Sequence, residues 1–324
     1  MLAAIPFHRY TSPETVPRPA QPKRTRILFG GDVMLSRHVA RLARAVHDPA
    51  SPLRDLAPVL RSADIAFVNL EAPFSDRGHV MEHGMVFKAE PEMIAALQTA
   101  GISIVSTANN HARDCGDHGV EFTLAWLHQH GIRTVGSAPT TEAAHAGTVI
   151  DLHGERFGFL AYTFDQSNGN YPDIDHRIAI MDIPTMRRDV ARLLQDHASV
   201  VIVSMHAGTE YQPHPNPYQT TFAHAALDAG ARVVVGHHPH VTQSWERVSN
   251  GVIFYSLGNL VFDQFQRAET QRGALAEVVF TGKTLESAAL IPVEIVRTIP
   301  RLAPKPVENV AASAAAPVAS IASR

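Results

Sequence analysis

Val233-Val234-Val235-Gly236-His237-His238-Pro239-His240 joins an apolar, β-branched run to a glycine and three histidines. Such a run is typical of a buried strand. Pro239 disfavours the helical region for the residue before it, so we expect the segment to stay extended. Residues two apart then point the same way, which predicts His238 and His240 on one side and His237 on the other. Two neutral imidazoles from one short segment can bind a metal ion.

The composition indicates a globular protein. The chain has 324 residues, of which 45% are hydrophobic and 18% charged. A net charge of −3 and scattered Lys and Arg argue against a nucleic-acid partner. Cys115 is the single cysteine, which excludes an internal disulfide and a cysteine-rich zinc site. No run approaches the roughly 18 to 20 apolar residues of a membrane span, so we predict no transmembrane segment.

The chain divides into three parts. Residues 1–24 form a proline-rich N-terminal lead that we expect to be disordered, residues 25–299 form the folded domain, and residues 300–324 form an Ala/Pro/Ser-rich tail. The lead lacks a basic segment followed by an apolar one, which argues against a signal peptide and for a cytoplasmic protein. Association with the cell envelope stays open. A polar loop at 166–175 is a candidate substrate-side insertion.

Periodicity and turn residues predict alternating strands and helices. We expect strands at 26–30, 65–68, 102–106, 200–204, 233–235 and 252–256, helices at 37–46, 53–61, 91–100, 120–130, 184–197 and 217–229, a hairpin over 148–152 and 157–162, and closing antiparallel strands near 274–280 and 289–297.

Polar side chains follow six of these apolar strands where each strand ends. Fully apolar strands between helices indicate a sheet buried on both faces, and ligands bind at the carboxyl ends of the strands in such sheets. Polar side chains from six strands at one edge of the sheet would form a single pocket. The polar groups are Asp32, Asn69 with Glu71, Asn110 with His111, His206, His238 with His240, and Asn259.

These side chains have the chemistry of a metal centre. Carboxylate, amide oxygen and imidazole suit one or two divalent ions of Mn, Zn, Fe, Mg or Ca. Asp32 or Glu71 could bridge two ions, which usually lie about 3.5–4 Å apart. We predict proton transfer by His111, oriented by Asp114. The predicted metal ligands are Asp32, Glu71, Asn110, His206, His238 and His240.

A further set of residues is predicted to contact substrate or to support the ligands. Glu210 follows His206 by four positions and could equally pair with a nearby arginine. Gly236 would let the backbone come close. The set comprises Asn69, Glu210, His237, Asn259 and Asp263.

Six ordered motifs resemble the CapA family of bacterial capsule, or poly-γ-glutamate, synthesis proteins, which is related to the calcineurin-like metallophosphoesterases. The resemblance covers about residues 26–297. It implies a four-layer α/β/β/α sandwich of the metallophosphoesterase type with a metal centre on one edge. The motifs are Gly31-Asp32-Val33-Met34-Leu35, Asn69-Leu70-Glu71, Ala108-Asn109-Asn110-His111 with Asp114 and Gly116, His206-Ala207-Gly208-Thr209-Glu210-Tyr211, Gly236-His237-His238-Pro239-His240-Val241, and Ser256-Leu257-Gly258-Asn259 with Phe262-Asp263.

The sequence departs from the metallophosphoesterase pattern at two ligand positions. Met34 stands where the opening Asp-x-His motif would place its histidine, and Asn69-Leu70-Glu71 replaces the next Gly-Asp motif. The CapA pattern shares both changes, which suggests altered chemistry. Ala207 stands where the family often carries tryptophan, which would change the substrate wall.

The preferred functional hypothesis is a metal-dependent, hydrolase-like enzyme of capsule or poly-γ-glutamate biosynthesis. The resemblance directs the substrate toward an anionic polymer or peptide and allows a membrane-bound synthase as a partner. Three alternatives stay open: a metal-dependent phosphoesterase on small substrates, a non-catalytic accessory subunit of a polymer synthase, and a metal-assisted peptide epimerase.

Overall fold

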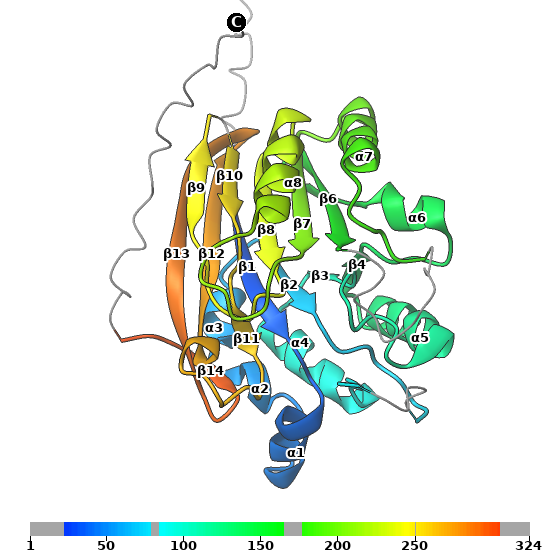
Figure 1. Ribbon diagram of the computed structural model, residues 1–324, viewed down its shortest axis with the longest axis vertical. Helices are drawn as coiled ribbons and strands as arrows, with labels where there is room; N and C mark the ends of the chain where they lie inside the picture. The colour runs from blue at the N-terminus through cyan, green and yellow to red at the C-terminus, as the bar shows by residue number, and fades with distance from the viewer. Residues whose placement is uncertain (1–22, 79–83, 165–176, 250, 305–324) are drawn as a thin grey trace, which may run out of the picture.

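Two β-sheets lie face to face, with helices on the outer face of each. The computed structural model describes residues 23–78, 84–164, 177–249 and 251–304. In Figure 1 the arrowheads of β1, β6 and β7 point the same way, so these strands from both sheets end at one edge. The arrangement confirms the predicted four-layer α/β/β/α sandwich.

The first sheet has the strand order β14-β13-β12-β1-β2-β3-β4, with β11 paired to β1. Its strands β1, β2 and β3 are parallel, whereas β12 and β13 close the sheet in antiparallel fashion, as predicted, and β14 adds a further antiparallel strand. The strands are β1 (Arg24–Val33), β2 (Ile65–Leu70), β3 (Ile104–Ser106), β4 (Arg133–Val135), β11 (Asn259–Val261), β12 (Arg272–Thr281), β13 (Thr284–Val296) and β14 (Ile299–Leu302).

The second sheet has the order β5-β6-β7-β8-β10-β9. The predicted hairpin forms its antiparallel β5–β6 edge, and β6, β7, β8 and β10 are parallel. The strands are β5 (Thr148–Leu152), β6 (Glu155–Thr163), β7 (Val200–His206), β8 (Val233–His237), β9 (Trp245–Val248) and β10 (Gly251–Phe254).

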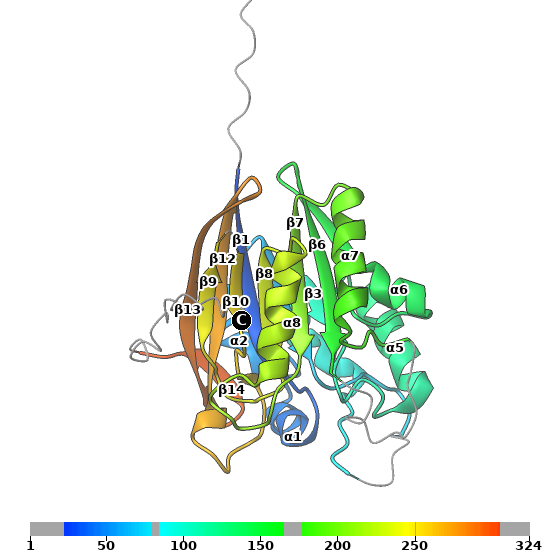
Figure 2. The same ribbon diagram turned by 45° about the horizontal axis from the view of Figure 1, so that its top comes forward.

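The helices divide between the two outer faces. In both views α7 and α8 cover β6, β7 and β8 (Figure 2). The first sheet carries α1 (Arg37–Ala45), α2 (Ser51–Arg54), α3 (Ala57–Leu60), the 3₁₀ turn η1 (Pro91–Met93), α4 (Ile94–Ala100) and α5 (Gly116–Gln129), and the second carries α6 (Thr141–Ala146), α7 (Ile183–Gln195) and α8 (Pro217–Asp228).

Two predicted boundaries need correction. The single helix expected at 53–61 is two short helices, because Pro58 cannot donate a backbone hydrogen bond within a helix and instead lies in the first turn of α3. The sheet also extends past the predicted domain end at 299, through β14.

Most of the predicted lead, the tail beyond 304 and the loop at 166–175 lie outside the described residues. Among those described, no helix combines the length and apolar character that crossing a bilayer requires.

Alternation along the strands decides which side chains enter which layer. In β2, Ile65 and Phe67 pack between the sheets, whereas Ala66 and Val68 pack under the first layer of helices. In β7, Ile202 lies between the sheets, and its neighbours on either side pack under α7 and α8. The same alternation fixes the direction of the polar residues at the strand ends.

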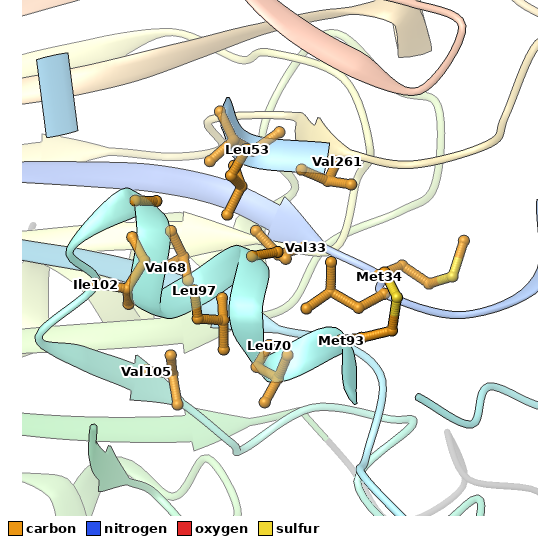
Figure 3. Close-up of a cluster of buried hydrophobic side chains, with 14 of the residues drawn as sticks. Val33, Met34, Leu53, Val68, Leu70, Met93, Leu97, Ile102, Val105 and Val261 are labelled. Atoms are coloured by element: carbon orange, nitrogen blue, oxygen red, sulfur yellow. The ribbon is translucent and has the colours of Figure 1, made fainter. Parts of the chain in front are cut away.

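Met34 belongs to the hydrophobic cluster outside the first sheet. Its side chain is fully buried, and Figure 3 shows it with Val33, Leu70 and Met93. The Met34 sulfur accepts hydrogen bonds from the Ser36 hydroxyl at 3.0 Å and the Ser36 amide at 3.3 Å. The methionine therefore contributes packing at the position where the metallophosphoesterase pattern has a metal ligand.

Two glycines allow backbone segments to approach closely beside the strand ends. A Cβ atom on Gly31 would lie 1.9 Å from the carbonyl oxygen of Gly258, and one on Gly236 would lie 2.0 Å from that of Tyr255. Both obstacles are backbone, so no side chain can move aside. The predicted close approach at Gly236 is confirmed.

We predict that Gly31→Ala lowers the free energy of unfolding by about 3 kcal/mol or more, since an added methyl group must displace the backbone of the β11 segment. Urea unfolding followed by circular dichroism measures the change. Gly78→Ala is the control, because a Cβ there meets nothing within 4 Å. Equal stability of the two variants would contradict the close-approach argument.

Candidate metal centre

The candidate centre lies where the carboxyl ends of strands from both sheets meet. Asn69, His206 and His237 continue the series of positions that face the space between the sheets in β2, β7 and β8. Asp32 lies one residue before the end of β1, after a register shift, and its amide donates to the carbonyl oxygen of Gly258 at 3.0 Å. The two sheets thus contribute opposite walls of one polar cluster.

Asp32 connects these walls. Its fully buried carboxylate accepts hydrogen bonds from the Asn69 amide at 2.8 Å and from the backbone N–H of His238 at 3.2 Å. The ring Nδ1 atoms of His240 and His237 lie 3.5 and 3.6 Å from its oxygens. Burial by itself would raise the Asp32 pKa, but the hydrogen bonds from His240 and Asn69 and the electrostatic attraction of the His237 and His240 rings lower it. Asp32 is therefore ionised at neutral pH.

Glu71 is the unsatisfied member of the cluster. Its side chain is fully buried, and neither carboxylate oxygen has a hydrogen-bond partner among the described residues. The nearest bases are His240 Nε2 at 3.7 Å and His111 Nε2 at 3.9 Å. Burial raises the Glu71 pKa well above its usual value, and the negative charges of Asp32, Glu210 and Asp114 add to this. A buried carboxylate in this state requires a proton or a cation.

Three of the buried histidines are held in their neutral form. Burial lowers the pKa of His237 to about 4 and, with repulsion from neighbouring histidines, that of His238 to about 3. Burial and the same repulsion lower the His206 pKa well below its usual value. Neutral imidazole is the form that binds metal ions, so protons do not compete for these rings at neutral pH.

Hydrogen bonds orient two of these rings. His206 Nε2 lies 2.7 Å from Asn110 Oδ1, and its Nδ1 lies 3.2 Å from the Asn69 amide nitrogen. His240 Nδ1 lies 2.9 Å from Asn259 Oδ1, which leaves Nε2 directed toward Glu71. Asn259 therefore holds the His240 ring at Nδ1 and fixes its orientation, as the carbonyl partner of a metal-bound histidine usually does.

The donor set fits a divalent cation. One ligand atom each from Asp32, Glu71 and His206 lie within 4.8 Å of one another, and all three residues are buried. The unpartnered Glu71 oxygens and the unpartnered Nδ1 of His238 add orphaned acceptors at the same place. Oxygen and nitrogen donors without sulfur suit the hard and borderline ions predicted from the sequence.

His111 and Asp114 form a dyad beside this cluster. His111 Nδ1 lies 2.7 Å from Asp114 Oδ2, which also accepts the Phe87 amide at 2.6 Å. The Phe87 ring stacks on the imidazole with centroids 3.9 Å apart. Since the ring is held on one face and at Nδ1, Nε2 is directed toward Glu71.

The expectation that the segment after β8 stays extended is wrong. The strand ends at His237, and His238 and His240 have positive φ angles of 97° and 59°. The turn brings the backbone N–H of His238 to Asp32, an interaction that local residue preferences do not reveal. The ring centroids of His238 and His240 lie 6.0 Å apart, and His237 Nδ1 also lies 3.6 Å from Asp32, so His237 does not point away from the cluster as predicted.

The other predicted residues lie around the cluster. His237 is fully buried near Phe67, with ring centroids 6.2 Å apart and both ring nitrogens lacking a partner among the described residues. Glu210 is exposed, although its charge contributes to the raised Glu71 pKa. Asp263 is buried in an ion pair with Arg37.

Sequence reasoning missed two residues that shape the site. Asn109 donates to the carbonyl oxygen of Leu70 at 2.8 Å and accepts the His111 amide at 3.1 Å, so it fixes the loop that carries His111. Its position beside Asn110 was the available indication. Phe87, which covers His111, comes from a distant polar loop and has no indication in the local sequence.

The two facing sheets and the carboxylate, amide and imidazole cluster at their strand ends define a protein of the metallophosphoesterase fold. Two solved structures from Thermus thermophilus are similar to the chain. A hypothetical protein has a TM-score of 0.52 and 20% identity, covering 83% of this chain and 99% of its own. A 5'-nucleotidase precursor has a TM-score of 0.51 and 13% identity, covering 86% of this chain and 54% of its own.

The chain belongs to the family of bacterial capsule synthesis proteins, PGA_cap, whose model matches residues 26–264. It is 30% identical to the capsule biosynthesis protein CapA of Bacillus anthracis, over 72% of this chain and 59% of the relative. It is also 30% identical to the PGA biosynthesis protein CapA of Bacillus subtilis (strain 168), over 73% of this chain and 63% of the relative. The chain therefore spans about three fifths of these relatives.

A third relative is a probable polyglutamine synthesis accessory protein of Mycobacterium tuberculosis. The identity is 28%, over 73% of this chain and 74% of the relative. The resemblance to the CapA family expected from the six motifs is thus confirmed.

We predict that the metal-free protein loses stability as the pH falls from about 6.5 to 4. His237 has a folded-state pKa of about 4 against 6.5 unfolded, so the unfolded chain binds more protons in this window. His237→Phe removes that contribution, worth about 3 kcal/mol across the window. Unfolding free energies measured in chelator between pH 4 and 7 should show a shallower slope for this variant, and an unchanged slope would contradict the prediction.

Proposed function

We propose that the protein is a divalent-metal-dependent enzyme that acts on an anionic polymer or peptide of the capsule or poly-γ-glutamate type. The observation that carries the proposal is the buried, unpartnered Glu71 carboxylate, placed beside the His240 ring and facing the His111–Asp114 dyad. In a structural ion pair, a hydrogen-bonded partner would satisfy such a carboxylate. A carboxylate that faces only imidazole rings instead suits a cation-binding site.

Both walls of the cluster contribute ligands in this proposal. A divalent ion bound there supplies Lewis acidity toward a carbonyl or phosphoryl oxygen. Asn69 and Asn259 hold Asp32 and His240 in place through the hydrogen bonds described above. The residues that would hold the ion are Asp32, Glu71, Asn110, His206, His238 and His240.

His111 would transfer the proton. Asp114 accepts from Nδ1 and fixes the tautomer in which Nε2 is the exchangeable site. His111 is 8% exposed, so its ring can reach a bound substrate while bulk water is largely excluded by Phe87. This arrangement supports a general acid or base beside Glu71.

The substrate assignment rests on the relatives. Two Bacillus relatives bear names of capsule and PGA biosynthesis. A polymer of this kind carries a negative charge on each unit, and a bound cation would offset the repulsion between that charge and the buried carboxylates. A membrane-bound synthase would be the natural partner of such an enzyme.

An accessory role is the second candidate, favoured by the name of the Mycobacterium tuberculosis relative. The two candidates differ in turnover. Co-purification with a membrane synthase, together with no cleavage of γ-linked glutamate oligomers or aryl phosphates in the presence of Mn²⁺, would favour the accessory role.

We predict that Mn²⁺ or Zn²⁺ binds stoichiometrically and stabilises the protein by about 2.7 kcal/mol at a concentration 100 times the Kd. Glu71→Gln should abolish this gain yet leave the metal-free protein equally or more stable, because it removes a buried acid that has no hydrogen-bond partner. Elemental analysis and thermal unfolding with and without metal measure both effects.

His224→Ala is a matched control for the metal measurement, since His224 on α8 forms a half-exposed pair with Glu246 at 2.9 Å, outside the polar cluster. It should bind metal as the wild type does. An unchanged metal-dependent gain in Glu71→Gln would overturn the metal assignment.

We predict that His111→Ala lowers kcat about 100-fold or more toward a γ-linked glutamate oligomer without loss of bound metal, because the variant lacks the proton-transfer group. Asp114→Asn should lower kcat about 10-fold or more, since it no longer fixes the ring. Release of free amino groups is the measurement.

His118→Ala provides the matched control, because His118 forms a surface pair with Asp76 at 2.6 Å. Activity should be unchanged in that variant. Loss of metal in His111→Ala would instead place this histidine among the ligands. Turnover of 4-nitrophenyl phosphate but not of the oligomer would favour the phosphoesterase alternative.

A further inference from the structure

Arg37, the first residue of α1, has an unusual backbone conformation. Its φ angle is 51°, in the left-handed region that long side chains rarely adopt. Such a conformation persists only when surrounding contacts impose it, and it often occurs at binding sites. The contacts of its guanidinium group identify what imposes it here.

A single buried carboxylate holds Arg37 in place. Asp263 Oδ2 accepts from Arg37 Nε at 3.1 Å, and Oδ1 accepts from Nη2 at 2.5 Å. The His38 amide donates to the same carboxylate at 3.2 Å. The Asp263 side chain is 4% exposed, whereas that of Arg37 is 33% exposed. The arginine is therefore fixed along one edge and open to solvent along another.

The guanidinium group lies close to the candidate metal centre. The Arg37 guanidinium carbon lies 5.2 Å from the centroid of Phe87, the ring that stacks on His111. The Phe87 ring thus contacts both this cation and the proposed proton-transfer group. Among the described residues, none accepts a hydrogen bond from Nη1, so this nitrogen is available to a ligand.

The charges in the centre explain why a cation at this position matters. Asp32, Glu71 and Asp114 place acidic groups below the rim, and an anionic substrate must approach them. A fixed guanidinium offsets that repulsion and presents planar donors that match a carboxylate. Arg267 adds a second cation to the rim, with its guanidinium carbon 4.8 Å from the Tyr211 ring centroid.

We propose that Arg37 is a substrate-binding residue that recognises an oxyanion next to the reacting bond, and that this oxyanion is a carboxylate of the polymer. The inference rests on the proposed function and deepens it, because it assigns selection of the anionic substrate to a residue outside the metal ligands. Asp263 is then a positioning residue that holds the guanidinium group in place while the Arg37 backbone adopts the left-handed conformation.

The first test measures binding of a γ-linked glutamate decamer to metal-loaded protein by isothermal titration calorimetry. Arg37→Gln should raise the Kd about 10-fold or more, and Arg37→Lys should give a smaller increase, since lysine keeps the charge but loses the planar fork. Arg37→Asn, whose side chain tolerates the left-handed region, removes the guanidinium with less backbone strain and should match Arg37→Gln.

Two further variants separate recognition from structural support. Arg24→Gln is the matched control, because Arg24 forms an exposed ion pair with Glu286 at 2.9 Å, at the end of β1 opposite Asp32. Its Kd should equal that of the wild type. Asp263→Asn keeps the arginine but loosens it, so the Kd should rise less than in Arg37→Gln.

The choice of ligands tests the chemistry of recognition. A γ-linked isoglutamine decamer, in which neutral amides replace the α-carboxylates along the chain, should bind equally to the wild type and Arg37→Gln. If the variant weakened binding of tripolyphosphate but not of the glutamate decamer, the assignment to a carboxylate would be overturned. Equal decamer affinity in Arg37→Gln and the wild type, with only a lower Tm in the variant, would show that Arg37 merely supports the fold.

Metal content measured on each sample distinguishes failure of the proposed function from failure of the role proposed for Arg37. A wild type that binds no metal would overturn the proposed function. A wild type that binds metal and decamer, with Arg37→Gln indistinguishable from it, would overturn this inference alone.

Discussion

The Asp32 carboxylate is the interaction on which the centre depends, because it receives donors from both sheets. Asn69 from β2 and the backbone N–H after β8 converge on it, although they are far apart in the sequence. These bonds require the strand ends to stay in register across the sandwich. Gly31 and Gly236 make that possible, since each permits a backbone contact that a Cβ atom would block.

Burial of so many ionisable groups is unfavourable for folding in the absence of a ligand. The Glu71 carboxylate lacks hydrogen-bond partners among the described residues, and the pKa values of three buried histidines are depressed. Replacing such groups with apolar residues often stabilises a protein. Their presence together at one edge of the sandwich therefore fits a functional requirement better than a structural one.

Much of this arrangement could be predicted from the sequence, because alternation and composition report on local structure. The apolar runs located the strands, and the polar residues after them located the edge. Two features could not be predicted this way. The turn at His238 depends on a hydrogen bond to Asp32, and the cover over His111 depends on Phe87, which approaches from a separate loop. Both are consequences of tertiary contacts. Pro58, by contrast, was a local indication of the split between α2 and α3.

The division of donors between the sheets couples the centre to the packing of the sandwich. The first sheet and its loops provide carboxylates and amides, including Asp32, Glu71 and Asn110, whereas the second provides His206, His238 and His240. Carboxylates gathered alone would repel one another, and neutral imidazoles alone would lack charge for a divalent cation. Only the packed sandwich combines both kinds of donor. Metal binding would consequently stabilise the contact between the sheets, and disruption of that contact would weaken metal binding by the same free energy.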